Sequence, residues 1–482
     1  MNTTNDYIKK LLETKKKVIN NSLLHEFSSD ETYQEKVQTI IDIQNEIMAN
    51  WEVRSRIIEF KNESVRVPNG TQNIEYSHTF DTSLIQKHQI ISFDLDGLDE
   101  LGLTFDKETG TLAGMPETSG NFKIKILFNV KGEGESAEQN EKLIDIVFNP
   151  DPKLLWKNIP SDTEAIFWKE ENSSISDTLG EKSIIISSKR GRSHQNDGTF
   201  RDDDFAYKHF DENDWSVIAV SDGAGSASFS REGSKVACNE IISYFENEIL
   251  PSKELDAIEA QLDEFSETKN ETILTEAENE AKKVLYKAVL HAHNKINELA
   301  QQTFEENEAL FNRKNTSYNA EYFHATLIVT AIKKTKIGYV ILTFGVGDCP
   351  IGIVNKDKTE ARLLNWLDVG EFGGGTRFIT QPSIFHSKER PMVSRFNMHI
   401  QEDFSHLFLM TDGIYDPKFE VEANLEKTEK WLEFIDDLEG KNEDKIGIDF
   451  SAELPEAEAQ LNNWMDFWSK GNHDDRTLAI IY

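Results

Sequence analysis

Four short acidic segments between residues 201 and 477 carry the residue types best suited to chemistry. Apolar runs lead into Asp222 and Asp412 and follow Asp475, so these carboxylates stand at the ends of predicted strands. Carboxylates at strand ends are well placed to meet at one edge of a sheet, where their repulsion requires divalent cations. The pattern therefore predicts a metal site, and such sites commonly carry out phosphate chemistry. The segments are RDDDFAY (201–207), VSDGAGSA (220–227), MTDGIYD (410–416) and NHDDRT (472–477).

The composition limits the classes of protein to which this chain can belong. A length of 482 residues predicts two or three domains. The formal net charge of -34 argues against nucleic acids and anionic membrane surfaces as partners. No apolar run has the length of a membrane span, and the N-terminus lacks the apolar core of a secretory signal. Cys238 and Cys349 are the only cysteines, so we expect no disulfide framework and a cytoplasmic location.

Residues 1–150 are expected to form two parts. In residues 1–62, apolar side chains recur at helical spacing, which predicts helices that dock on a neighbour or bind a partner. Residues 63–150 contain short alternating strands separated by turns, which predicts a small all-β domain. This domain resembles the immunoglobulin-like, cadherin-related domains of bacterial proteins, which implies a β-sandwich that serves as a spacer or binding module. The residues that carry the resemblance are Leu103, Phe105, Thr109, Gly110, Gly114, Pro116, Gly120 and Phe122.

A polar linker is expected over residues 151–180, followed by a domain of residues 181–482 with helical insertions near 251–315 and 420–470. The tight turn KKTK joins two predicted strands into an antiparallel hairpin, and strands and helices are grouped apart. We therefore expect the α+β class, not a doubly wound nucleotide-binding fold. The predicted strands are Ile184–Ser188, Trp215–Ser221, Tyr322–Ile332, Ile337–Val346, Met392–Ile400, Ser405–Met410 and Thr477–Tyr482, and the predicted helices are Arg231–Leu250, Glu276–Gln302, Val421–Leu438 and Pro455–Lys470.

Eight motifs in this last domain occur in an order that is typical of one enzyme family. They are SSKRGRSH, RDDDFAY, AVSDGAGSASFSREG, FHATLIV, FGVGD, GEFGGGTRF, FLMTDGIYD and HDDRTLAII. In this order they resemble the type 2C, metal-dependent serine/threonine protein phosphatases, and Ala-Gly-Ser after Asp-Gly is similar to the bacterial branch. The resemblance implies a four-layer α-β-β-α sandwich of two antiparallel sheets. It also implies two or, in some members, three Mn²⁺ or Mg²⁺ ions in a cleft at one edge.

The resemblance further implies a role for each acidic motif. In the first motif Asp203 matches the metal-binding carboxylate, with Asp202 or Asp204 as alternative registers. In the last motif Asp475 is the alternative register. The implied metal-binding residues are Asp203 (first carboxylate), Asp222 (bridging both metals), Gly223 (through its carbonyl group), Asp348 (an additional, weaker metal), and Asp412 and Asp474 (the metal on the C-terminal side).

The expected reaction explains why oxygen ligands are needed. Mn²⁺ and Mg²⁺ are hard cations that take carboxylate oxygens and retain waters. Two of them about 3.5–4 Å apart can share one water and lower its pKa, so that hydroxide attacks phosphorus in line without a phosphoenzyme. The Cys-x5-Arg phosphate loop is excluded, because Tyr244 and Asn355 stand six residues beyond the two cysteines.

The chain departs from the family pattern at two functions, proton donation and phosphate binding. Many eukaryotic members have His after Asp-Gly, where this chain has Ala224. His194 is our candidate for the general acid, and a histidine satisfied within a loop is the alternative. For the phosphate-binding arginine, Arg190, Arg192 and Arg201 compete, and Arg192 is favoured.

Two classes of function follow from these motifs. The first is an active phosphatase that removes phosphate from Ser or Thr of cytoplasmic proteins and opposes a bacterial Ser/Thr kinase. The second is a catalytically weak or inactive scaffold that binds phosphoproteins or partner proteins. Retention of all the expected carboxylates favours the enzyme, because an inactive site has no physical need to keep mutually repelling charges together.

Overall fold

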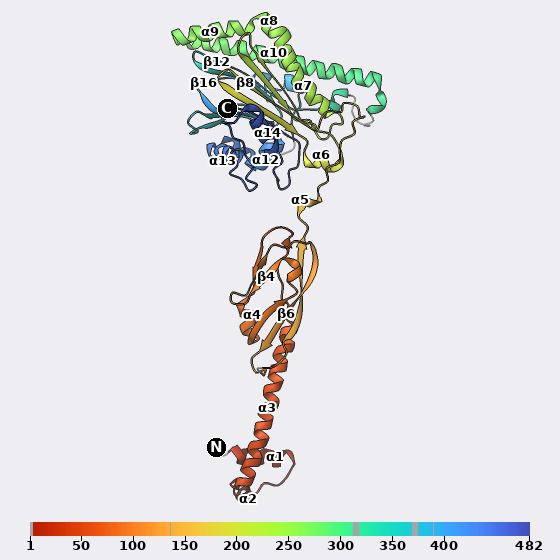
Figure 1. Cartoon of the computed structure of the whole chain (residues 1–482), viewed down its shortest axis with the longest axis vertical. Helices are drawn as coiled ribbons and strands as arrows, with labels where there is room; N and C mark the ends of the chain where they lie inside the picture. The colour runs from red at the N-terminus through yellow and green to blue at the C-terminus, as the bar shows by residue number, and fades with distance from the viewer. Residues whose placement is uncertain (1–2, 135, 312–317, 369–374, 389) are drawn as a thin grey trace. The chain divides into compact units, whose positions relative to one another are not determined.

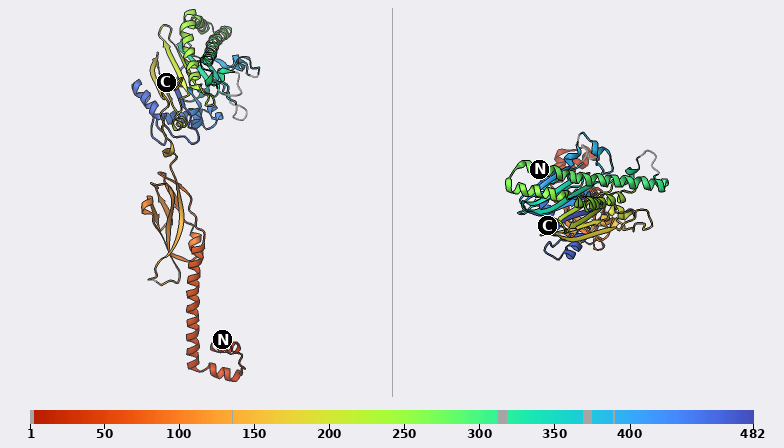
Figure 2. Two further views of the ribbon diagram at one scale, coloured as in Figure 1. Left: turned by 90° about the vertical axis from the view of Figure 1, so that its right-hand side faces the viewer. Right: turned by 90° about the horizontal axis from the view of Figure 1, so that it is seen from above.

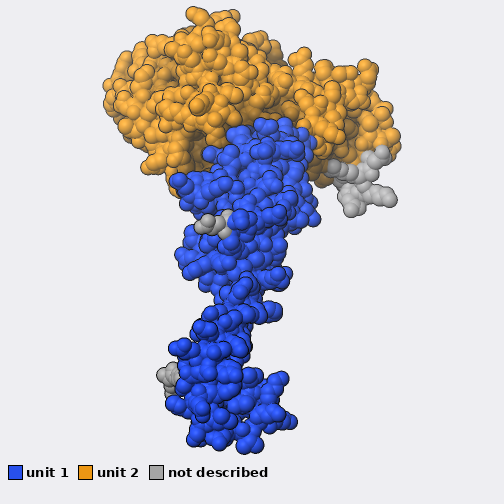
Figure 3. Space-filling model, turned by 60° about the horizontal axis from the view of Figure 1, so that its bottom comes forward, with its two compact units in different colours: residues 1–155 blue, residues 156–482 orange. Residues whose placement is uncertain are grey.

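The computed structural model describes residues 3–134, 136–311, 318–368, 375–388 and 390–482 (Figure 1). The chain falls into two compact units, residues 1–155 and 156–482, which are coloured separately in Figure 3. Among the described residues, no helix combines the length and apolar character needed to cross a membrane.

Unit 1 begins with three helices, α1 (Thr3–Thr14), α2 (Asn21–Ser28) and α3 (Glu31–Asn62). The side chains of Asn20 and Asp30 accept hydrogen bonds from backbone N–H groups in the first turns of α2 and α3, which fixes where these helices begin. Ile8, Leu24 and Val37 form a small buried cluster. This cluster holds α1 and α2 against the N-terminal part of α3.

The strands of unit 1 form two sheets, one of four strands in the order β1-β7-β6-β3 and one of three strands in the order β2-β5-β4. Side chains of β6 and β7 alternate between buried and more exposed positions, as expected of strands with one face on a core. Phe60 of α3 is fully buried in that core and contacts the ring of Phe128 edge-on. The elements are β1 (Gly70–Thr71), β2 (Tyr76–Thr79), α4 (Thr82–Lys87), β3 (Ile90–Asp96), β4 (Leu103–Asp106), β5 (Thr111–Gly114), β6 (Gly120–Val130) and β7 (Asn140–Asn149), followed by α5 (Pro152–Leu155).

Unit 2 contains a five-stranded sheet in the order β10-β11-β12-β13-β16 and a six-stranded sheet in the order β15-β14-β17-β18-β9-β8. Every pair of neighbouring strands in these sheets is antiparallel. The strands are β8 (Asn172–Leu179), β9 (Lys182–Lys189), β10 (Asp204–Phe210), β11 (Trp215–Ser221), β12 (Leu327–Thr335), β13 (Gly338–Val346), β14 (Ile351–Asn355), β15 (Ala361–Leu363), β16 (Phe396–Gln401), β17 (Phe404–Met410) and β18 (Arg476–Ile481).

Apolar side chains of unit 2 are buried on both faces of both sheets. Ile218 of β11, Leu409 of β17 and Ile481 of β18 belong to one buried cluster that is shared by the two sheets. A second cluster joins the five-stranded sheet to α7 (Ser230–Tyr244), α9 (Glu254–Thr268) and α10 (Glu271–Glu306), and a third joins the six-stranded sheet to α12 (Asp412–Phe419), α13 (Thr428–Leu438) and α14 (Leu454–Trp464). Figures 1 and 2 show these two groups of helices on opposite sides of the strands. The expected α+β class is confirmed.

Several elements differ from the sequence prediction. Residues 151–180, expected to be a linker, contain β8, which pairs along its whole length with β9. β8 was missed because its sequence NSSISDTL is polar and only partly buried. Tyr322 lies in a 3₁₀ turn and β12 begins at Leu327, while Met392 lies in another 3₁₀ turn and β16 begins at Phe396. These two strands are shorter than predicted because apolar residues in the preceding turns also face the core.

Candidate metal centre

The carboxylates singled out by the sequence stand at strand ends of both sheets in unit 2. Asp204 pairs with Ser221 across β10 and β11, so the residues just before β10 meet those just after β11. Likewise Met410 pairs with Leu478, so the end of β17 meets the start of β18. Antiparallel pairing therefore gathers the acidic motifs at common edges. The carboxylates are Asp203 before β10, Asp222 after β11, Asp348 after β13, Asp412 after β17 and Asp474 before β18.

These carboxylates lie close enough to shift one another's protonation. Removal from water raises the pKa of Asp222 well above its usual range, and the charges of Asp412, Asp203, Asp474 and Asp348 raise it further. The pKa of Asp412 is raised in the same way, first by burial and then by Asp474 and Asp348. Burial and the charge of Asp475 raise the pKa of Asp203 to about 7. A divalent cation among these groups would remove the repulsion that causes these shifts.

Two of the carboxylates have an oxygen that is buried without a hydrogen-bond partner among the described residues. Asp203 is fully buried, and its Oδ2 accepts hydrogen bonds from Thr411 (2.7 Å) and Thr477 (2.8 Å), whereas its Oδ1 has none. Asp348 accepts a hydrogen bond from Thr376 at Oδ2 (2.8 Å), whereas its Oδ1 has none. Buried polar atoms normally have a partner, so these two oxygens fit ligands to a cation.

The first acidic motif has three consecutive aspartates with different surroundings. Asp204 faces Lys169, whose Nζ lies 2.9 Å from its carboxylate, and Arg201 lies 3.6 Å away. Burial alone would raise the pKa of Asp204, but these two cations lower it below its usual range. Asp202 lies beside His194, with 3.9 Å between its Oδ2 and the imidazole Nε2. Of the three registers, the arrangement favours Asp203 as the metal-binding carboxylate and disfavours Asp204.

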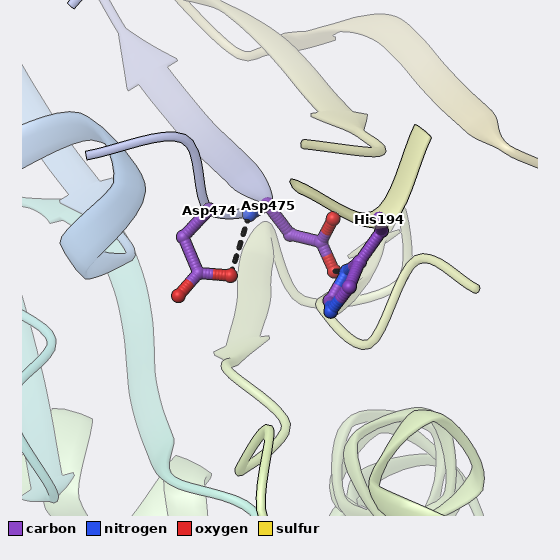
Figure 4. A group of neighbouring side chains, drawn as sticks. All are labelled: His194, Asp474 and Asp475. Atoms are coloured by element: carbon purple, nitrogen blue, oxygen red, sulfur yellow. Dashed lines mark hydrogen bonds and ion pairs between the residues drawn. The ribbon is translucent and has the colours of Figure 1, made fainter. Parts of the chain in front are cut away.

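The two aspartates of the last acidic motif, Asp474 and Asp475, also have different surroundings (Figure 4). Both oxygens of the buried Asp475 are already occupied: Gly191 N–H donates to Oδ1, and Asp202 N–H and the His194 ring contact Oδ2. The carboxylate of Asp474 is exposed and points away from His194, and one of its oxygens accepts a hydrogen bond from the N–H of Asp475 (2.9 Å). Asp474 is therefore the member of the pair that is available to a cation.

His194 lies in the short helix α6 (Arg192–Asp197) and is held by the acidic motifs. Its Nδ1 is 3.0 Å from Asp475 Oδ2, which leaves Nε2 on the side of Asp202. Burial alone would lower the pKa of His194, but the charge and hydrogen bond of Asp475, together with Asp202, raise it to about 9. An imidazolium oriented in this way can donate a proton.

The three candidate arginines are bonded to groups other than the carboxylates that are candidates to bind metal. Arg192 Nη2 donates to the carbonyl oxygen of Asp466, and its guanidinium lies over the ring of Trp468 (5.5 Å to the centroid). Arg190 is buried and forms an ion pair with Glu171 (3.1 Å), while Arg201 donates to Ser188 Oγ and to the backbone oxygen of Asp203. Arg192, the arginine that the sequence analysis favoured for phosphate binding, therefore has its guanidinium against Asp466 and Trp468. Its neighbours Trp468 and Asp466, distant in sequence, determine its direction.

Of the remaining predicted ligands, Gly223 packs closely against the backbone of the first motif, and the Asp348 carboxylate lies near that of Asp222. A Cβ atom at Gly223 would lie 2.6 Å from the carbonyl oxygen of Asp202, so only glycine fits beside the first motif. Asp222, Asp348 and the Cys349 thiol offer ligand atoms within 4.8 Å of one another, as do His194, Asp474 and Asp475. Cys349 is a poor candidate ligand, because burial raises the pKa of its thiol and hard cations prefer oxygen.

Lys169 is the principal site residue that the sequence did not reveal. Its buried Nζ donates to the backbone oxygens of Asp203 (2.7 Å) and Arg231 (3.1 Å) and to the carboxylate of Asp204 (2.9 Å). A single lysine in a polar stretch gives no sequence signal for this contact. Thr411 and Thr477, which donate hydrogen bonds to the Asp203 carboxylate, do give one, because each lies within an acidic motif.

The family-model comparison agrees with these motifs. A family model described as "Protein phosphatase 2C" matches residues 190–466, which is more than half of the chain. A bacterial serine phosphatase structure shares 16% identity and a TM-score of 0.32, covering 65% of this chain and 97% of its own. The structure of RsbX in complex with magnesium shares 13% identity and a TM-score of 0.31, covering 64% of this chain and 98% of its own. The structure of Stp1 from Staphylococcus aureus shares 13% identity and a TM-score of 0.31, covering 67% of this chain and 96% of its own. No curated protein matches this sequence.

If the carboxylates repel one another, Asp222→Asn should have opposite effects with and without metal. In EDTA the variant should be more stable than the wild type, by about 1 kcal/mol or more, because one buried negative charge is removed. With Mn²⁺ the wild type should gain stability and the variant should gain much less. Thermal unfolding checks both effects, with Asp357→Asn, an exposed turn residue, as the control. A variant that is destabilised in EDTA but keeps the Mn²⁺ effect would contradict the site.

Lys169→Met should weaken metal binding, because the backbone of Asp203 and the carboxylate of Asp204 lose their shared cation. We expect Mn²⁺ affinity to fall by about tenfold in calorimetric titration, which corresponds to about 1.4 kcal/mol. Lys169→Arg, which keeps the charge, should lower Mn²⁺ affinity less, and Lys153→Met, at an exposed lysine, should leave it unchanged. Circular dichroism verifies folding. Wild-type affinity in a folded Lys169→Met protein would show that Lys169 does not position the motif.

Proposed function

This chain belongs to the protein phosphatase 2C family, and we propose that it is a metal-dependent hydrolase of phosphoserine and phosphothreonine on proteins. The observation that carries the proposal is the buried Oδ1 of Asp203, which has no hydrogen-bond partner in the described part of the chain and lies within a cluster of mutually repelling carboxylates. Such a cluster is unfavourable without cations and well suited to them. We propose Mn²⁺ or Mg²⁺ as the cations, two in number, with Asp348 as a ligand for a third.

Each acidic motif has a part in holding the cations. Asp203 presents its free Oδ1, while Thr411 and Thr477 fix its other oxygen. Asp222 is held in place through its backbone: its N–H donates a hydrogen bond to Thr326 Oγ1 (2.9 Å), and its backbone oxygen accepts one from Thr326 N–H (2.8 Å). Asp222 is the proposed ligand shared by both cations, and the Gly223 carbonyl would complete the shell of one of them. Asp412 and Asp474 would hold the cation on the C-terminal side.

The bound cations supply Lewis acidity, which makes water nucleophilic at neutral pH and offsets negative charge on the phosphoryl group. The protein residues then have two tasks, orientation and proton donation. We assign proton donation to His194, because Asp475 orients its ring and raises its pKa to about 9, so that Nε2 carries a proton at neutral pH. The leaving alkoxide of serine or threonine requires such a proton, and Ala224 cannot supply it.

The wider assignments follow the same proposal. We interpret the two sheets and flanking helices of unit 2 as the four-layer sandwich of the family, and the sheets of unit 1 as an immunoglobulin-like domain. We further propose a cytoplasmic phosphoprotein as substrate and a Ser/Thr kinase of the same cell as the opposing enzyme. A weak or inactive scaffold is the second candidate, because the Arg192 side chain is directed to Trp468 and Asp466 instead of the carboxylates.

Asp412→Asn should abolish turnover. The substitution removes one negative ligand on the C-terminal side of the site, so kcat/KM with p-nitrophenyl phosphate and Mn²⁺ should fall by about 100-fold or more. EDTA should have the same effect on the wild type, and Asp357→Asn should remain active. Absence of wild-type activity with both Mn²⁺ and Mg²⁺ would favour the scaffold.

His194→Asn should separate substrates by their need for a proton donor. Asparagine can keep a hydrogen bond to Asp475 but cannot protonate a leaving group. With a phosphothreonine peptide, kcat should fall by about 100-fold, whereas p-nitrophenyl phosphate, whose leaving group is a weak base, should be hydrolysed at nearly the wild-type rate. His209→Asn, at the far end of β10, is the matched control and should change neither rate. Equal losses on both substrates would refute a general-acid role for His194.

A further inference from the structure

The middle of α3 exposes large apolar side chains to solvent. Figures 1 and 2 show this part of the helix, between α1–α2 at one end and the strands of unit 1 at the other, without a neighbouring element in the described part of that unit. A row of such residues on one helix commonly marks an interaction surface. The exposed side chains, with their exposed fractions, are Ile40 (39%), Ile43 (51%), Ile47 (61%), Met48 (56%), Trp51 (67%) and Ile58 (59%).

The helix itself does not depend on this surface for its stability. Its N-terminal part packs through Val37 against α1 and α2, and its C-terminal part packs through Val53, Ile57 and Phe60 against the strands of unit 1. The two ends therefore hold the helix, and its middle presents a preformed face. Binding of a partner to this face costs little conformational entropy, because the helix is already ordered.

The exposed face has the spacing of a coiled-coil seam. Six positions of α3 recur at alternating intervals of four and three residues, namely Ile40, Gln44, Ile47, Trp51, Arg54 and Ile58. This spacing keeps one stripe of the helix facing a second helix, parallel or antiparallel. Four of them are apolar, and the two polar ones, Gln44 and Arg54, are exposed. The six positions that directly flank this stripe carry no charge that would repel a second helix; they are Ile41, Ile43, Met48, Asn50, Ser55 and Ile57. The six positions of the stripe itself, from Ile40 to Ile58, are called the α3 seam below.

The seam is complementary to the same seam of a second copy that runs in the opposite direction. When two copies pair antiparallel about residue 49, Ile40 faces Ile58 of the second copy, Ile47 faces Trp51, and Gln44 faces Arg54. Apolar residues then meet apolar ones, and the amide oxygen of Gln44 can accept a hydrogen bond from the guanidinium of Arg54. A parallel pairing in register would instead place Arg54 against Arg54, and like charges repel. The sequence of the seam thus favours the antiparallel arrangement.

The available area suffices for a dimer of moderate affinity. The exposed parts of the six apolar side chains amount to on the order of 600 Å² per copy, so pairing would bury about 1,200 Å², the lower bound for specific interfaces. We propose that two copies of this chain pair antiparallel through the α3 seam, with dissociation in the micromolar range. This proposal is independent of phosphatase activity, because it rests on unit 1 alone.

Sedimentation equilibrium of the full chain tests the pairing. At about 100 µM the wild type should have about twice the 55.1 kDa mass of the chain. Ile47→Glu with Trp51→Glu should be monomeric, since both changes place charge in the seam. The matched control is Asn45→Glu with Ala49→Glu, two exposed positions about 160° around the helix from Ile47, and it should remain dimeric. A monomeric wild type at this concentration, or equal masses for both double variants, would overturn the proposal.

Cysteine cross-linking tests the direction of pairing. The two native cysteines are fully buried, so introduced thiols should dominate oxidation. An equimolar mixture of Ile40→Cys and Ile58→Cys proteins should form a disulfide-linked dimer, whereas each protein alone should not. Cross-linking of either variant alone would indicate a parallel pair and would contradict the antiparallel seam.

Discussion

Repulsion among clustered carboxylates is the constraint on which unit 2 depends. Asp203, Asp222, Asp348, Asp412 and Asp474 converge because antiparallel pairing brings the ends of strands together at one edge. Hydrophobic packing of both sheets imposes this convergence, whether or not the charges are compensated. The fold therefore stabilises an acidic edge that is unfavourable by itself, and cation binding is the physical way to make it favourable. Metal binding and stability of unit 2 should be linked for this reason.

The structure separates the acidic residues into two groups. Asp204 and Asp475 are neutralised by the protein, the first by Lys169 and Arg201 and the second by His194 and backbone N–H groups. Asp203, by contrast, keeps an oxygen that has no hydrogen-bond partner among the described residues. Lys169, Arg201 and His194 thus hold the loops that present the proposed metal-binding carboxylates. Because the ligands come from both sheets, bound cations would also join the two sheets across the edge.

Sequence patterns predicted the parts of the fold in which burial is uniform. β11 and β17 were predicted nearly in full, because apolar runs with both faces covered are recognisable without tertiary information. β8 was missed because an edge strand with polar residues has no such run. The acidic motifs were recognisable from their order, but the register within Asp202–Asp204 was not. It depends on Lys169, more than thirty residues away in sequence, and the direction of Arg192 likewise depends on Trp468.

Anomalous diffraction from crystals grown with Mn²⁺ would show whether these carboxylates hold cations. We expect two strong peaks on either side of the Asp222 carboxylate, each about 2.1 Å from its oxygen ligands. One peak should contact Asp203 Oδ1, directly or through a water, and the other should contact Asp412 and Asp474. Crystals in which this edge contains no anomalous peak at saturating Mn²⁺, while the carboxylates keep the positions described here, would contradict this expectation.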